Sequence, residues 1–164
     1  MTLPRPRLIN LLIFIATSGL MSVGFIMEHQ MGLEPCPLCM TQRIFIVLTG
    51  FFGLLAFLHN PGLRGTQIYG TATLLSALTG GGFSIRQLYL QSLPEDLVPA
   101  CGPSLSYILD TFPLAHALKL MLTGDGNCAE VAWTFMGISI PGWTLVAFAA
   151  LAGISIWQIV RSSR

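Results

Sequence analysis

The sequence predicts an all-α membrane protein, an antiparallel bundle of four transmembrane helices with two periplasmic loops and a short membrane-parallel helix. Composition is the first reason, because 53% of the residues are hydrophobic and only 9% are charged, whereas soluble domains carry about 25% charged residues. Four long apolar stretches and a one-sided distribution of charge are the other two. The net charge of +1, without a basic stripe, argues against a nucleic-acid partner.

The four apolar stretches form one predicted domain over residues 1–164, with spans at about residues 9–27, 41–58, 68–85 and 143–160. A spanning helix needs about 20 residues, within a range of about 17–25. The second stretch approaches this length if Thr41 to Arg43 form its first turn. Glycines in the third stretch are tolerated in membrane helices. The first stretch is longer than a signal-peptide core and lacks a small-residue cleavage site, so we expect it to remain as a span.

Charged residues divide between the two sides of the predicted bundle. With four spans, the N-terminus, the loop at residues 59–67 and the C-terminus share one side, which holds no acid. The positive-inside rule therefore predicts that both termini are cytoplasmic and that the protein lies in a bacterial inner membrane. The cations of that side are Arg5, Arg7, Arg64, Arg161 and Arg164. The seven acids of the opposite side are Glu28, Glu34, Glu95, Asp96, Asp110, Asp125 and Glu130.

The four cysteines, Cys36, Cys39, Cys101 and Cys128, all fall in the two loops assigned to the periplasm. Disulfides form and persist in that compartment. Four cysteines allow three pairings. The spacing favours a C-x-x-C pair of Cys36 with Cys39, and a second pair that closes a loop from Cys101 to Cys128.

Two interpretations without redox chemistry compete for these cysteines. A structural disulfide suits Cys101 and Cys128, because closing a loop of this length can stabilise a protein by about 3–4 kcal/mol. It suits Cys36 and Cys39 poorly, since so small a ring removes little entropy from the unfolded chain. A zinc site requires two close pairs or a pair with suitably spaced histidines, and the sequence has no such pattern. We therefore predict no metal site.

Redox exchange is the interpretation that fits the C-x-x-C pair. Cys39 lies at the start of the second predicted span, where free backbone N–H groups and the helix dipole favour a thiolate. Arg43 follows four residues later, on the same helical face. Its guanidinium can stabilise that thiolate and donate a hydrogen bond to a carbonyl oxygen. Alone, Arg43 would be interpreted as an interface anchor.

The long second loop carries the other two cysteines. Proline and glycine flank Cys101 and indicate an exposed, irregular backbone. Residues 105–122 repeat apolar side chains at helical spacing, which predicts a helix on the membrane surface that Pro113 divides. Packing against a core is the alternative for this helix. Glycines just before Cys128 indicate a flexible turn.

Taken together, these motifs resemble the DsbB family of bacterial membrane oxidases. The resemblance covers essentially the whole chain. Its specific segments are Glu34-Pro35-Cys36-Pro37-Leu38-Cys39 with Gln42-Arg43, Pro99-Ala100-Cys101-Gly102-Pro103, and Asn127-Cys128-Ala129-Glu130 with Trp133-Thr134-Phe135-Met136-Gly137 and Pro141-Gly142-Trp143.

The resemblance implies a quinone-dependent oxidation of a DsbA-like periplasmic thiol oxidase. In that scheme Cys101, paired with Cys128 at rest, is attacked by the reduced partner, and Cys128 then engages Cys36. Cys39 is left as a thiolate that passes electrons to ubiquinone or menaquinone. Arg43 would hold the quinone, and Arg86 with Gln87 are further candidates for lining its site.

Two other functions stay open. A protein similar to vitamin K epoxide reductase would share the four-helix plan and a C-x-x-C, but that family carries this motif late in the chain. In this sequence the motif precedes the second span. A membrane scaffold with purely structural disulfides is the non-enzymatic alternative, and it predicts that replacing Arg43 has no effect.

Overall fold

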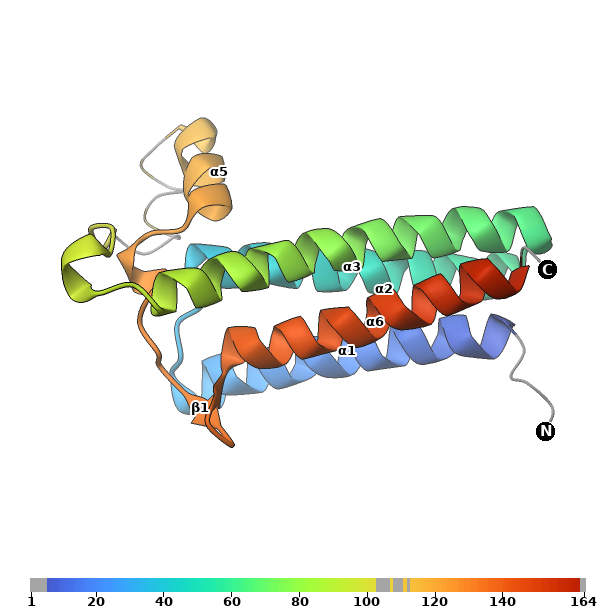
Figure 1. Ribbon diagram of the computed structural model, residues 1–164, viewed down its shortest axis with the longest axis horizontal. Coiled ribbons are helices and arrows are strands. Elements are labelled where there is room, and N and C mark those ends of the chain that lie inside the picture. The colour runs from blue at the N-terminus through green and yellow to red at the C-terminus, as the bar shows by residue number, and fades with distance from the viewer. Residues whose placement is uncertain (1–5, 103–106, 108–110, 112, 163–164) are drawn as a thin grey trace.

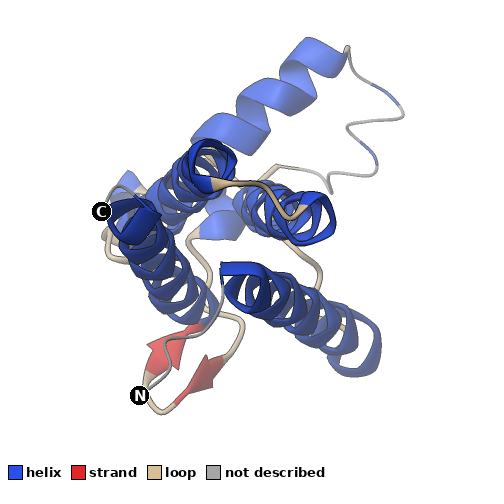
Figure 2. Cartoon of the chain, turned by 90° about the vertical axis from the view of Figure 1, so that its right-hand side faces the viewer, coloured by secondary structure: helices blue, strands red, loops and turns tan. Residues whose placement is uncertain are grey.

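The computed structural model describes residues 6–102, 107, 111 and 113–162. Its long helices are α1 (Pro6–Met31), α2 (Pro37–His59), α3 (Leu63–Gln91) and α6 (Ile140–Ser162). The shorter elements are η1 (Glu95–Leu97), α5 (Leu114–Thr123), η2 (Gly126–Cys128), β1 (Thr134–Phe135) and β2 (Ile138–Ser139). The long helices run side by side, with the start of α1 and the end of α6 at one end of the bundle (Figures 1 and 2).

Each predicted span lies within one of the four long helices, and each helix extends beyond the span at both ends. The largest extension of α2 is at its N-terminus, where Pro37 occupies the first turn and Cys36 is the cap. Proline suits this position because the first turn has no intrahelical partner for its N–H. The cysteine pair therefore belongs to the beginning of α2, ahead of the apolar run.

Many large apolar side chains lie on the surface of the bundle, as expected for a membrane protein. Three helices, α1, α2 and α6, are long and apolar enough to cross a membrane. Large apolar side chains on them are exposed, including Leu12, Phe25, Phe51 and Val146. Buried positions in the described chain are instead often small or polar. Small and hydrogen-bonding residues between helices are typical of packing within lipid.

The helix α3 contains the third predicted span but is not among those three. The buried side of α3 carries glycine, threonine, serine and glutamine, which lowers its overall hydropathy. Its outward side carries large apolar side chains along its length, with Ile68, Leu75, Leu78 and Ile85 exposed. The helix packs against α2 and α6 along the bundle.

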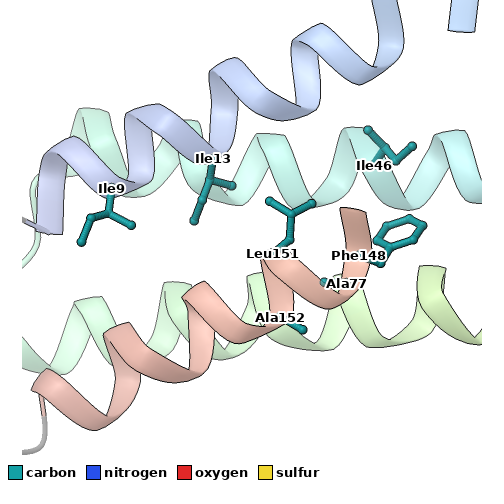
Figure 3. Close-up of a cluster of buried hydrophobic side chains, with 7 residues drawn as sticks. All are labelled: Ile9, Ile13, Ile46, Ala77, Phe148, Leu151 and Ala152. Carbon is teal, nitrogen blue, oxygen red and sulfur yellow. The ribbon is translucent and has the colours of Figure 1, made fainter. Parts of the chain in front are cut away.

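The main hydrophobic cluster occupies the middle of the bundle and joins all four long helices (Figure 3). Its members are Ile9, Ile13, Ile46, Ala77, Phe148, Leu151 and Ala152. A Cβ atom at Gly80 would overlap the ring of Phe148. Glycine at this position therefore lets α3 and α6 approach closely, the arrangement that small residues give to membrane helices.

The helix α5 and the hairpin of β1 and β2 lie at the end of the bundle that carries the cysteines. The helix α5 lies across the bundle axis (Figures 1 and 2), and its Ala117 is buried. Thr41 Oγ1 of α2 donates to Met121 O of α5 at 2.7 Å, so this helix packs on protein on one side. Residues 105, 106, 108–110 and 112 of its predicted extension, as well as Arg5 and Arg164, lie outside the described residues.

The hairpin of β1 and β2 was missing from the sequence-based prediction. Thr134 pairs with Ser139 and Phe135 with Ile138. Between them, Met136 and Gly137 both have positive φ angles of 53° and 78°, as a tight two-residue hairpin turn requires. The strands are two residues each, too short for an alternating apolar pattern to reveal them.

Candidate functional site

The C-x-x-C pair is built into the first turn of α2. Cys36 caps the helix, and its sulfur accepts a hydrogen bond from the backbone N–H of Cys39 at 3.4 Å. The two sulfur atoms are 2.9 Å apart. The helix geometry thus brings both thiols to one place, with Cys39 in the first turn of the helix.

The Cys128 thiol reaches the same place from the second loop. Cys128 has no exposed surface and packs with Leu38 and Leu90 in a second apolar cluster. Gly124 precedes it with a φ angle of +77° and lies against both leucines, where a Cβ atom would collide. This turn brings the chain down onto α2, so that Cys36 packs against the cluster that contains Cys128.

Cys101 lies on the outer side of Cys128 and is exposed. Two hydrogen bonds hold the segment around Cys101 to η2. Gly126 N donates to Ala100 O at 3.2 Å, and Asn127 Nδ2 donates to Gly102 O at 3.0 Å. A Cβ atom at Gly126 would lie 2.9 Å from the Cys101 sulfur. Contacts therefore link Cys39 to Cys36 and Cys36 to the cluster of Cys128, and the exposed Cys101 lies beside Gly126, two residues before Cys128.

All four cysteines lie in the described part of the chain and are free thiols in the structure. The predicted pairing of Cys101 with Cys128 therefore stays a prediction. The contact of Cys36 with both Cys39 and Cys128 is what the structure adds. Among the described residues, no group of three His, Cys, Asp or Glu side chains has the arrangement of a metal site.

The pKa values of Cys36 and Cys128 are shifted in opposite directions. The hydrogen bond with Cys128, then the bond with Cys39 and burial, raise the pKa of the Cys36 thiol above its ordinary value. The hydrogen bond from Cys36 is the main cause that lowers the pKa of Cys128. A hydrogen bond to the charged form favours that form. The arrangement thus keeps the proton on Cys36 and favours a thiolate at Cys128.

A cavity of about 790 Å³ opens beside the thiols and is lined by Cys36, Cys39, Arg43 and Gln87. Most of its other walls are apolar side chains from α1, α6 and the segment before the hairpin. Its volume falls within the range of about 300–1,000 Å³ typical of sites for small molecules. An apolar ligand with a polar head could lie here with its head against the Cys39 sulfur.

Arg43 lines this cavity and also has partners within the protein. Its guanidinium forms a salt bridge with Glu28 of α1 and donates to Gly24 O at 3.1 Å. It lies over the ring of Phe25, 5.5 Å from the centroid. These contacts fix the guanidinium at the boundary between α1 and α2.

Of the two further candidates, the structure brings Gln87 but not Arg86 to the cavity. Gln87 is buried, and its side-chain Nε2 is 3.3 Å from both Cys36 Sγ and Cys39 Sγ. Arg86 is exposed, is absent from the lining, and contacts Thr123 O and the ring of Tyr89 instead. Adjacent residues in a helix point in directions about 100° apart, which separates the two side chains.

Sequence reasoning missed the roles of Glu28 and Gln42 in this site. Glu28 was counted only as a charge of the outer side, although it is the ion-pair partner of Arg43. Gln42 was noted only within a motif, although its Nε2 donates to Gln87 Oε1 at 2.6 Å. An uncharged polar residue inside an apolar span was the available signal, because such side chains need internal partners.

The fold and the site define a helical membrane protein with a four-cysteine thiol centre beside a largely apolar cavity. The family model for disulfide bond formation protein DsbB matches residues 6–158. The chain belongs to the DsbB family.

Individual relatives agree over nearly the full length. The chain is 52% identical to disulfide bond formation protein B of Saccharophagus degradans over 161 residues, covering 98% of this chain and 97% of that protein. It is 51% identical to the protein of the same name from Hahella chejuensis over 158 residues, 96% of each. It is 45% identical to disulfide bond formation protein B 1 of Pseudomonas aeruginosa over 161 residues, 98% of this chain and 99% of that protein.

Proposed function

We propose that this protein is a disulfide-generating oxidoreductase that oxidises a DsbA-like periplasmic dithiol protein and passes the electrons to membrane quinone. The names of its relatives support a role in disulfide bond formation. The observation that carries the full reaction is the Cys39 thiol at the wall of a large apolar cavity, in contact with a second thiol and next to Arg43.

Electrons enter at Cys101, the exposed one of the four cysteines. A thiolate of the reduced partner attacks the Cys101 sulfur of a Cys101–Cys128 disulfide, and Cys128 leaves as a thiolate. The lowered pKa of Cys128 supports this step, because a more acidic thiol is a better leaving group. The second partner thiol then displaces Cys101, which releases the partner as a disulfide.

The contact between Cys128 and Cys36 carries the next exchange. The Cys128 thiolate attacks Cys36 of a Cys36–Cys39 disulfide, and Cys39 leaves as a thiolate. Cys101 then attacks Cys128, restores the outer disulfide and releases Cys36. Two electrons, taken from the partner, now reside on Cys36 and Cys39.

A quinone is a membrane-soluble acceptor of two electrons and two protons. The chain's own groups suit it: the apolar walls match a hydrophobic ring and tail, and Arg43 can donate to a carbonyl oxygen. Cys39 would give up the electron pair as its bond with Cys36 re-forms. Of the two protons that the quinone takes up, one would come from the Cys36 thiol and one from solvent, because Cys39 is already a thiolate. The disulfide and the quinol are then the products.

Quinone reduction by the purified protein in detergent tests the reaction. Reduced DsbA is the electron donor, and absorbance of the quinone is followed. We expect turnover by the wild type and none by Cys36→Ser or Cys101→Ser. A wild type that reduces no quinone while its cysteines remain oxidised would support the alternative, a scaffold with structural disulfides.

We further propose that α3 is a fourth span, with both termini cytoplasmic and the cysteines periplasmic in the inner membrane. The exposed apolar side of α3 supports this, as does the excess of arginine at the opposite end of the bundle. A membrane-impermeant maleimide added to cells with a permeable outer membrane should label a protein whose one cysteine is Cys101. In a cysteine-free background, Gly62→Cys should be labelled only after lysis. Labelling of both in unlysed cells would contradict this topology.

A further inference from the structure

A buried row of polar side chains runs from α6 to the redox thiols. Thr144 Oγ1 of α6 donates to Gln42 Oε1 at 2.6 Å, and Ser84 Oγ of α3 donates to the same oxygen at 3.0 Å. Gln42 Nε2 donates to Gln87 Oε1 at 2.6 Å. Gln87 Nε2 lies 3.3 Å from Cys36 Sγ and from Cys39 Sγ. Gln42 and Gln87 are each only 3% exposed.

The two hydroxyl groups set the direction of this row. Each hydroxyl has one proton, and each also lies near a helix carbonyl: Thr144 is 3.0 Å from Pro141 O, and Ser84 is 3.2 Å from Gly80 O. Both distances are longer than the distance from the same hydroxyl to Gln42 Oε1. The two hydroxyls also lie 3.1 Å from each other, and a hydrogen bond between them still leaves one proton to donate to Gln42. The Gln42 oxygen faces the hydroxyls and its NH₂ group faces Gln87.

The orientation of Gln42 in turn fixes that of Gln87. With its oxygen held by the Gln42 NH₂ group, Gln87 presents its own NH₂ group to the two sulfur atoms. A thiolate accepts hydrogen bonds, so this arrangement stabilises the charged form. In this orientation the Gln87 oxygen also lies 3.6 Å from Cys39 Sγ, farther than the NH₂ group. If Gln87 were reversed, its oxygen would take the nearer position, where Cys39 Sγ–H would donate to it as a neutral thiol.

We propose that Gln42 is a positioning residue that holds the Gln87 amide with its NH₂ group toward Cys36 and Cys39, so that the reduced site keeps Cys39 as a thiolate. The inference deepens the proposed function, since that thiolate is the electron donor of the reaction. Gln87 touches the reacting sulfur, whereas Gln42 acts through Gln87. Arg43 supplies charge from another direction, so the two contributions are separable.

The decisive variant is Gln42→Glu. A carboxylate keeps the hydrogen bonds from Ser84 and Thr144 but has no proton to donate to Gln87. Gln87 then turns its NH₂ group toward the carboxylate and its oxygen toward the thiols. In the fully reduced protein, alkylation of Cys39 by iodoacetamide, measured by mass spectrometry across pH, should reach its half-maximal rate at a higher pH. The rate at pH 7 should fall about tenfold, the effect of losing one hydrogen bond to a charged group.

Two further variants separate this cause from others. Gln42→Leu introduces no charge but also removes the donor to Gln87, so it should shift the pH profile in the same direction. Thr144→Val weakens the anchoring of Gln42 and should give a smaller shift. The control is Thr49→Val, which removes a buried hydroxyl from α2, the helix that also carries Gln42. This hydroxyl, ten residues along the helix from Cys39, donates to Phe45 O, so the profile should stay unchanged.

The outcomes distinguish this inference from the proposed function. Shifts with both Gln42 variants and none with Thr49→Val would support it, even if no quinone were reduced. A shift with Gln42→Glu but none with Gln42→Leu would overturn it, because the buried charge alone would then be the cause. Unshifted profiles for both variants would overturn it as well, while quinone turnover by the wild type would still stand.

Discussion

The guanidinium of Arg43 forms a salt bridge with Glu28 across the interface of α1 and α2, at the wall of the cavity that Cys39 also lines. Both side chains are partly buried, 19% and 30% exposed respectively. Glu28 therefore holds the cation in place, while the Arg43 donors that it leaves free remain available to a ligand. This ion pair connects α2, which carries Cys39, with α1 beside the cavity.

Replacing Arg43 is expected to weaken quinone binding more than chemistry. Arg43→Ala should raise the quinone KM about tenfold, the contribution of one hydrogen bond to a charged group, with a smaller effect on kcat. Glu28→Gln should raise KM by less, because Gly24 O still holds the guanidinium. Arg86→Ala, which removes an exposed arginine outside the cavity lining, is the matched control. Steady-state quinone reduction checks all three, and an equal effect of Arg86→Ala would contradict the assignment.

The opposite pKa shifts of Cys36 and Cys128 predict different pH profiles for the two thiols. Cys128 has a lowered pKa, so its thiolate fraction rises at a pH below the ordinary value of 9.0. Cys36 has a raised pKa, so it stays protonated above that value. In the reduced protein, alkylation of Cys128 should reach its half-maximal rate at a lower pH than alkylation of Cys36. Mass spectrometry of the labelled peptides measures both profiles.

Asp125 provides an internal check on that order. It is buried, and its Oδ1 lies 3.6 Å from Cys128 Sγ, where its charge raises the pKa of Cys128. Asp125→Asn removes the charge and should move the Cys128 profile to still lower pH. An upward shift would contradict this repulsion, because it would mean that the carboxylate stabilises the thiolate indirectly.

The approach of Cys101 to η2 depends on Gly126. A side chain there would collide with Pro99 O and with the Cys101 sulfur. Gly126→Ala should therefore slow the oxidation of reduced DsbA about tenfold or more, while the pH profile of Cys39 alkylation stays unchanged. Gly19→Ala, at a position with open space around it, is the control. Normal DsbA oxidation by Gly126→Ala would show that the apposition of the two segments is not needed for turnover.

Packing between α3 and α6 predicts a stability difference between two neighbouring glycines. Gly80→Ala places a methyl group against the Phe148 ring and should lower stability by about 1–3 kcal/mol, the usual effect of overpacking. Gly82→Ala meets no atom within 4 Å and should be neutral or slightly stabilising. Thermal unfolding in detergent compares them, and equal unfolding temperatures would contradict the close approach of the two helices.

The sequence alone determined the membrane class and the four long helices, because hydropathy and helix length are local properties of a chain. It also indicated the contact of Cys36 with Cys39 and the position of Arg43 one turn from Cys39, since both follow from helical spacing. The limits of the helices were less certain. Polar residues such as Thr41 and Gln87 extend α2 and α3 past their apolar runs, because the backbone hydrogen bonds continue where hydropathy falls.

Only the tertiary structure decided which distant residues meet. Cys128 packs on Cys36 because the turn at Gly124 and the Leu38–Leu90 cluster bring the second loop onto α2. Arg43 pairs with Glu28, and Gln42 with Gln87, across helix interfaces whose rotation no local pattern specifies. Arg86 and Gln87 were equal candidates in the sequence, and the rotation of α3 alone turns one into the cavity and the other outward. Such choices depend on how side chains of different helices fit together, which hydropathy and spacing do not encode.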